Sequence, residues 1–275
     1  QLTRLFASDK EGDRGKIGKF GIGFVSIFAL SPRTVLVHTG RQGEAWEVTF
    51  HEDRTFTRTP LPTAFEGTEV SLFLETDAQT HAELARGARA ALWRWCRFAE
   101  VELRFCDRSA GTRESERIHA PFTVEGECAV HLVRPGQEMW LAFDARPTYG
   151  FYNRGLTLLE SADAEETLGE LAADFHQVSF RVRADVLEHT LSRETIYRDE
   201  QLTRVLGELR EAARGPLLET LAEVLAALAA LPAPRPDELG RYFRLIAFLA
   251  GVDPALLVAH QDRRLLRAHG SGPHS

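Results

Sequence analysis

Ten residues near the start of the chain, GKIGKFGIGF at 15–24, have the composition of a phosphate-binding loop. Their glycines let the backbone bend sharply and leave its N–H groups uncovered; they are Gly15, Gly18, Gly21 and Gly23. An apolar helical turn, VSIFAL, follows directly. Glycines placed ahead of a helix predict a loop whose N–H groups surround an anion at the helix N-terminus. A flexible surface loop is the alternative that the glycines alone leave open.

The segments that must position this loop predict an α+β domain over residues 1–107. Runs that alternate Val, Thr and Phe with polar residues are typical of antiparallel strands joined by tight turns. The expected elements are a short helix at 24–32, strands at 33–40, 44–50, 54–61, 67–75 and 100–107, and a helix at 80–99. A polar segment at 108–117 is expected to link this domain to the next.

Residues 118–231 predict a second domain, of α/β type, that ends in helices. Its expected strands are 121–133, 138–144, 150–160 and 178–186, and its expected helices are 163–175 and a long one from Thr195 onward that bends at Gly215-Pro216. Residues 232–275 predict a proline-rich linker, a C-terminal helix at 237–250 and a disordered tail.

The composition excludes several classes of protein. Of the 275 residues, 44% are hydrophobic and 27% charged, which is typical of a globular protein, and the net charge of -7 argues against nucleic-acid binding. The longest apolar run, at 221–231, is far below the about 20 residues that span a bilayer. Three cysteines without metal-ligand spacing, and histidines without a metallohydrolase motif, predict no metal site and a reducing, cytoplasmic location.

Three motifs carry a family resemblance, and their order is part of it. IGKFGIGFVSIF at 17–28 resembles the second glycine box of the GHKL ATPases in the version found in the heat shock protein 90 chaperones. GTEVSLFL at 67–74 resembles the Gly-Thr strand of that family, and LSRETIYRDEQLTRVL at 191–206 resembles its middle-domain arginine segment. The resemblance covers nearly the whole chain and is weakest at about 108–150 and after 232. It implies the distal half of a GHKL (Bergerat-type) helix-on-sheet ATPase domain, followed by a ribosomal S5 domain 2-like middle domain.

The resemblance also implies an ATP site. Its phosphate-binding residues would be Gly18, Lys19, Phe20, Gly21, Ile22, Gly23 and Phe24. Thr68 would hydrogen-bond the adenine region through its hydroxyl. Taken without the family, Thr68 is an ordinary strand threonine and Lys19 an ordinary solvated lysine.

By the same resemblance, Arg193 would be the catalytic arginine that reaches the γ-phosphate when the two domains close. A guanidinium suits this task because it is permanently charged and forms a flat fork of donors. The alternative is a helix-start arginine that pairs with Glu194 or Asp199, with Ser192 as the helix cap. Four positions on, the family has a glutamine where this chain has Tyr197, which can donate one hydrogen bond but cannot replace an amide.

The family's glutamate base, its magnesium-binding asparagine and its adenine-binding aspartate all precede the second glycine box. We therefore expect this sequence to be a fragment, with the Mg²⁺ ligand in a preceding part. Because a base is needed to activate water, we expect no ATPase activity from the fragment itself and leave its status as an enzyme open. Strands that would pair with the preceding part are expected to leave an open, apolar edge.

The function expected from these motifs is that of an ATP-dependent chaperone that assists the folding of client proteins, with a homodimer in the full-length parent and no nucleic-acid or membrane partner. Two alternatives stay open. One is a non-catalytic scaffold that keeps the fold and binds partner proteins. The presence of Tyr197 in place of the family's glutamine favours this alternative. The other is a different GHKL ATPase, of gyrase or MutL type, although such a protein would use a lysine from its second domain.

Overall fold

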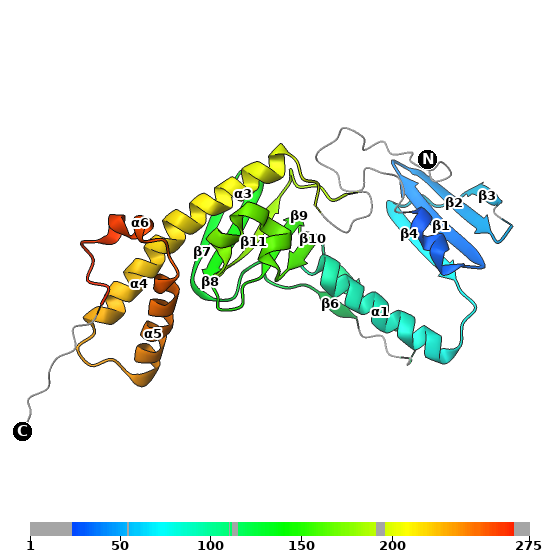
Figure 1. Cartoon of the computed structure of the whole chain (residues 1–275). Helices are drawn as coiled ribbons and strands as arrows, with labels where there is room; N and C mark the ends of the chain where they lie inside the picture. The colour runs from blue at the N-terminus through cyan, green and yellow to red at the C-terminus, as the bar shows by residue number, and fades with distance from the viewer. Residues whose placement is uncertain (1–23, 54, 110, 112–114, 191–195, 267–275) are drawn as a thin grey trace, which may run out of the picture. The chain divides into compact units, whose positions relative to one another are not determined.

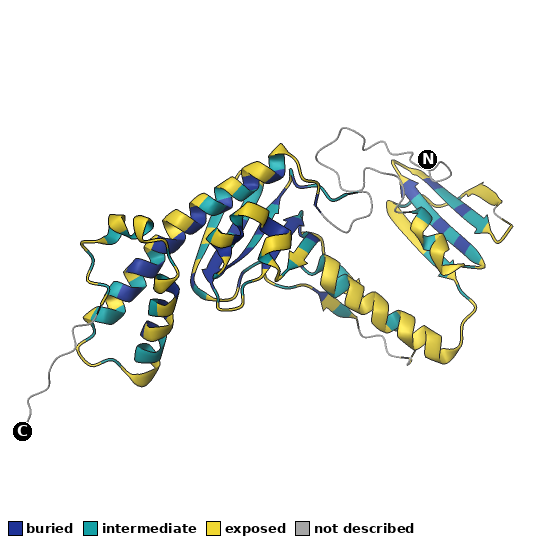
Figure 2. Ribbon diagram, in the orientation of Figure 1, coloured by how far each residue is buried: buried dark blue, intermediate teal, exposed yellow. Residues whose placement is uncertain are grey.

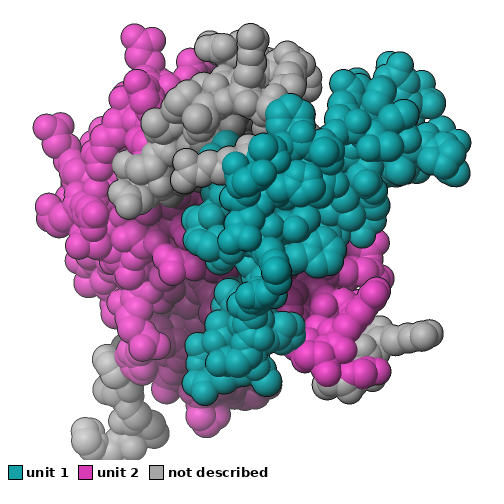
Figure 3. Space-filling view, turned by 90° about the vertical axis from the view of Figure 1, so that its right-hand side faces the viewer, with its two compact units in different colours: residues 1–89 teal, residues 90–275 magenta. Residues whose placement is uncertain are grey.

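The computed structural model describes residues 24–53, 55–109, 111, 115–190 and 196–266. The chain forms two compact units, residues 1–89 and 90–275, which Figure 3 colours separately. The division falls inside one helix, α1 (Ala78–Cys96). The domain limits predicted from the sequence, at 107 and 118, remain predictions.

Unit 1 contains a four-stranded antiparallel sheet, and its meander agrees with the alternation in the sequence. The strand order is β3-β2-β1-β4 (Figure 1). The strands are β1 (Thr34–Arg41), β2 (Glu44–His51), β3 (Phe56–Pro60) and β4 (Gly67–Phe73). Gln42 and Gly43, the two residues between β1 and β2, both have positive φ, as the tight hairpin turn that matches strand twist requires. A short 3-10 helix, η1 (Val25–Leu30), precedes β1.

Unit 2 is built on a five-stranded mixed sheet in the order β10-β9-β11-β8-β7. Its strands are β7 (Glu127–Arg134), β8 (Gln137–Phe143), β9 (Tyr149–Asn153), β10 (Leu156–Ser161) and β11 (Val178–Ala184). The pair β9–β11 is parallel and the other pairs are antiparallel. Together with unit 1, this arrangement confirms the α+β class.

One face of this second sheet makes the main hydrophobic core with the helices. These are α2 (Ala164–Leu168), η2 (Gly169–Phe175), α3 (Glu200–Ala212), η3 (Ala213–Leu217), α4 (Leu218–Ala230) and α5 (Pro236–Ala250). Figure 2 shows buried residues concentrated in the central strands and along the inner side of α3 and α4. Fully buried Leu141, Phe180, Val205 and Leu221 belong to this core. Two short C-terminal turns follow, α6 (Pro254–Leu257) and η4 (Val258–His260).

Several predicted boundaries in unit 2 were wrong. Residues 150–160 are not one strand, because Arg154 and Gly155 adopt positive φ and form the turn of the β9–β10 hairpin. The predicted helix at 163–175 is interrupted at Gly169, which has positive φ. The predicted strand at 121–133 begins only at Glu127, and part of the predicted linker forms β6 (Glu116–Ile118), paired with β5 (Leu103–Phe105).

The long helix was also predicted to begin too early. Its first helical residue is Glu200 rather than Thr195, because the Asp199 side chain caps the helix and accepts a hydrogen bond from the Leu202 N–H at 2.9 Å. The expected bend near Pro216 is a π-helical turn, η3. Proline has no N–H to donate to the carbonyl four residues earlier. The loss of that hydrogen bond accounts for the change from α-helical to π-helical geometry at this point.

Candidate functional site

Of the residues predicted to bind phosphate, Phe24 lies in the part of the chain that the structure describes. Gly18, Lys19, Phe20, Gly21, Ile22 and Gly23 lie outside the described residues, as does Arg193. The geometry around the predicted site is therefore that of Phe24, Thr68 and the residues next to them.

Phe24 packs on one face of the unit 1 sheet. Its ring centroid lies 5.4 Å from that of Phe50 and 6.0 Å from that of Phe28. It contacts the small core formed by Val35, Val37 and Val48. Because Phe24 leads directly into η1, these contacts fix where the chain that follows the glycine box meets the sheet.

Thr68 lies on this same sheet face. On β1, Val35, Val37 and Thr39 alternate onto the core face, and Thr68 is the direct cross-strand partner of Thr39. Their hydroxyl oxygens are 2.9 Å apart and form a hydrogen bond. Leu72, which packs against the core, is four residues further along β4, so Thr68 lies roughly 13 Å from it at about 3.3 Å per residue. The face thus carries Phe24, which directly follows the glycine box, at one end and the Thr68 hydroxyl at the other.

A cation on the same face was missed by the sequence analysis. Arg58 of β3 is the cross-strand partner of Val48, and its guanidinium carbon lies 3.5 Å from the centroid of the Trp46 ring. Trp46 in turn is the partner of Thr39. The alternation of RTFTRTPL could have indicated this, since it places Phe56 and Arg58 on one side of a strand. The opposite sheet face is polar, with His38 hydrogen-bonded to Glu47 at 2.9 Å.

The flanks of the predicted arginine segment are anchored. His189 and Ile196 form an antiparallel bridge, and the Tyr197 N–H donates to the Glu188 carbonyl at 2.7 Å. Tyr197 is 59% exposed. Asp199, one of the alternative partners considered for Arg193, caps α3.

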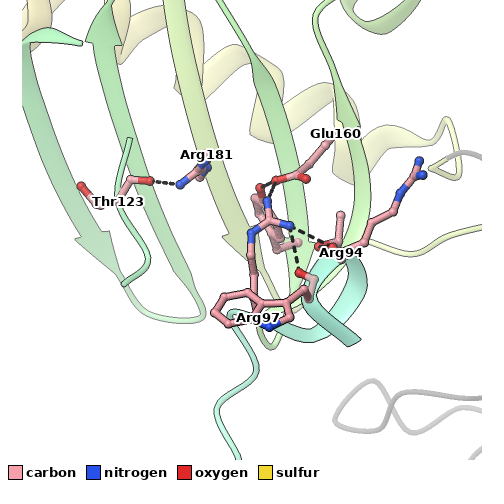
Figure 4. A network of polar contacts seen from close by, with 8 residues as sticks. Arg94, Arg97, Thr123, Glu160 and Arg181 are labelled. Atoms are coloured by element: carbon pink, nitrogen blue, oxygen red, sulfur yellow. Dashed lines mark hydrogen bonds and ion pairs between the residues drawn. The ribbon is translucent and has the colours of Figure 1, made fainter. Parts of the chain in front are cut away.

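Unit 2 also holds a polar cluster that no motif indicated (Figure 4). Arg97, just after α1, forms an ion pair with Glu160 of β10 and donates to the carbonyls of Trp93 and Arg94 at 3.1 and 3.0 Å. The buried Tyr152 donates to the same Glu160 oxygen. Arg181 of β11 donates to the Thr123 carbonyl.

The described residues offer neither a metal cluster nor a membrane-spanning helix. They contain no group of three or more histidine, cysteine, aspartate or glutamate side chains arranged to hold a metal ion. No helix among them has the length and apolar character needed to cross a membrane.

Part of the chain is similar in sequence to a known chaperone. Over 80 residues, 29% of this chain, the sequence is 36% identical to the chaperone protein HtpG of Roseobacter denitrificans. The aligned part is 13% of the length of that chaperone. No family model matches the chain. The similarity is a distant and partial relation to a chaperone of the heat shock protein 90 type.

Proposed function

We propose that this chain is part of an ATP-dependent chaperone related to heat shock protein 90, with the distal part of a GHKL nucleotide domain in residues 1–107 and a middle domain in 118–231. In the full-length protein, ATP binds against the unit 1 sheet, and its binding and hydrolysis assist client proteins. The bound ATP carries Mg²⁺, and the protein acts as a homodimer.

The observation that carries this proposal is the common sheet face of Phe24 and Thr68. A nucleoside triphosphate is an elongated molecule with an apolar base at one end and anionic oxygens at the other. A face with a hydroxyl at one end and the chain leading from a glycine box at the other suits that shape. Arg58 adds a positive charge to this face. The local similarity to HtpG agrees with this assignment.

The experiment measures binding of a fluorescent ATP analogue to the full-length protein, with Thr68→Val as the test. Valine keeps the shape of threonine but lacks the hydroxyl, so we expect affinity to fall about five-fold, the value of one hydrogen bond of about 1 kcal/mol. Thr59→Val is the matched control, because Thr59 is the partner of Glu47 and lies on the opposite face of the same sheet. Equal affinities for the two variants, or no binding by the parent, would contradict the proposal.

A second candidate function, that of a scaffold without ATP turnover, is favoured by Tyr197. This exposed tyrosine stands where the resemblance expects a glutamine. A phenol offers one donor, whereas an amide offers two donors and an acceptor. ATP-dependent suppression of client aggregation separates the candidates, because a scaffold would suppress aggregation equally with and without ATP.

A further inference from the structure

A cavity of about 280 Å³ opens beside the polar cluster of unit 2. Its charged lining residues are Arg97, Arg181 and Glu160, and the lining also includes the exposed Thr148. None of these residues belongs to the motifs that indicate ATP binding. All of them lie in unit 2, around β9, β10 and β11.

The floor of the cavity depends on a glycine. Gly150 of β9 is the direct partner of Glu160 on one side and of Arg181 on the other, so the three positions form one row across the sheet. A Cβ at Gly150 would lie 2.5 Å from the hydroxyl oxygen of Tyr152. The missing side chain therefore lets the Tyr152 ring fold back over Gly150 and reach Glu160.

The charge of Glu160 is already compensated. Burial, followed by the hydrogen bond to Glu160, raises the pKa of the Tyr152 hydroxyl far above its usual value, so the phenol keeps its proton and donates it to the carboxylate. Arg97 supplies the second partner of that carboxylate. Because Arg97 and Glu160 balance each other, the cavity lining carries one net positive charge, that of Arg181.

The two arginines retain donors for a ligand. A guanidinium has five N–H donors, and among the described contacts the Arg181 side chain uses one, on the Thr123 carbonyl. Both guanidinium carbons also lie within 5.0 Å of the centroid of the same Phe98 ring. The lining thus brings two guanidinium groups to one aromatic ring, and both would attract an anion in the cavity.

We propose that this cavity binds a small oxyanion of the size of phosphate, held by the guanidinium of Arg181, the remaining donors of Arg97 and the hydroxyl of Thr148. This site is separate from the ATP site proposed for unit 1. Glu160 limits the affinity of this site, because its negative charge belongs to the same cavity lining.

The experiment titrates the full chain with inorganic phosphate, with sodium chloride at matched ionic strength as the reference, and follows the NMR signals of the Gly150 amide and the arginine Nε–H groups. Arg181→Gln should weaken phosphate binding at least about ten-fold, and Glu160→Gln should tighten it several-fold, because these changes remove opposite charges. Arg183→Gln is the matched control: Arg183 is two residues along β11 and is paired with Glu138 at 2.8 Å. Its substitution should leave affinity within about two-fold.

Equal shifts with phosphate and chloride, or unchanged affinity in Arg181→Gln, would overturn the proposal. If Arg181→Gln fails to fold, Thr148→Val replaces it, since Thr148 is exposed and its substitution removes one hydroxyl donor. Several-fold weaker binding by Thr148→Val together with tighter binding by Glu160→Gln would support the site. Unchanged binding by both would refute it.

Discussion

Replacing Gly150 by alanine is the sharpest test of how the unit 2 sheet is packed. The added Cβ would lie 2.5, 2.8 and 2.9 Å from three atoms of the Tyr152 phenol, far inside van der Waals contact. Overpacking of this kind costs about 1–3 kcal/mol, and displacing Tyr152 from the Glu160 carboxylate adds about 1.5–3 kcal/mol. Alanine recovers about 0.5–1 kcal/mol because glycine is unfavourable in a strand. We therefore expect Gly150→Ala to lower the free energy of unfolding by about 1.5–5.5 kcal/mol.

The destabilisation caused by Gly150→Ala should disappear when Tyr152 is shortened. The three nearest atoms to the added Cβ all belong to Tyr152, so in a Tyr152→Leu background the clash and the displaced hydrogen bond are both gone. Gly150→Ala should there be neutral or stabilise by up to about 1 kcal/mol. Gly207→Ala is the matched control: Gly207 is exposed in α3 with open space around it, and its substitution should stabilise by about 1 kcal/mol in either background.

Urea denaturation followed by tryptophan fluorescence measures these differences, since Trp93, Trp95 and Trp140 all lie in unit 2. An equal loss of stability from Gly150→Ala in both backgrounds would refute the reasoning, because the cost would then not come from Tyr152. A stabilising effect of Gly150→Ala in the protein that retains Tyr152 would refute it as well.

Three further predictions concern catalysis, pH and exposed surface. In the full-length protein, Arg193→Ala should lower kcat by far more than it weakens ATP binding, up to about 10³-fold, because the contact is made mainly in the transition state; an unchanged kcat would favour the scaffold. Burial opposes ionisation of Glu138, but hydrogen bonds from His131 and Arg183 outweigh it and hold the pKa of its carboxyl below the usual 4.5. The ionised Glu138 carboxylate therefore stabilises the fold above pH 4.5, and this stabilisation is lost as the pH falls through the lowered pKa. The free energy of unfolding, measured as the pH is lowered, should fall more steeply in the parent than in Glu138→Gln. No residue of α1 is buried and Leu84 is exposed, so the chain should bind a hydrophobic dye and Leu84→Lys should bind less; no dye binding by the parent would contradict this.

The unit 1 sheet could be predicted from the sequence because local patterns determine it. The strand predicted at 44–50 is found at Glu44–His51, and the one predicted at 67–75 is found at Gly67–Phe73. Alternation identifies such strands without knowledge of their partners. The β9–β10 hairpin was missed because its turn has arginine at the first positive-φ position, where glycine or asparagine usually marks the turn.

The polar cluster of unit 2 could not be predicted, because its members are far apart in the chain. Arg97 and Glu160 are separated by 63 positions. Neither has a neighbour in sequence that suggests an ion pair, and their meeting depends on where the end of α1 lies on the sheet. A register shift in β10 between Thr157 and Leu159 also affects which residue faces Arg97. Strand irregularities of this kind have no reliable signature in a single sequence.

Arg193 is either a catalytic arginine or a structural residue at the start of α3. The residues on both sides of it, which the structure describes, show where α3 begins. As a structural residue, Arg193 would start the helix and pair with Glu194 or Asp199. The helix instead starts at Glu200, and an oxygen of the Asp199 carboxylate accepts the capping hydrogen bond from Leu202. The chain on either side of 191–195 is joined by the His189–Ile196 bridge and by the bond from Tyr197 to Glu188, contacts made independently of the helix. Arg193 thus precedes the first residue of α3 by seven positions, and its ligand contact stays a prediction, for which a large loss of kcat with little change in melting temperature is the expected result.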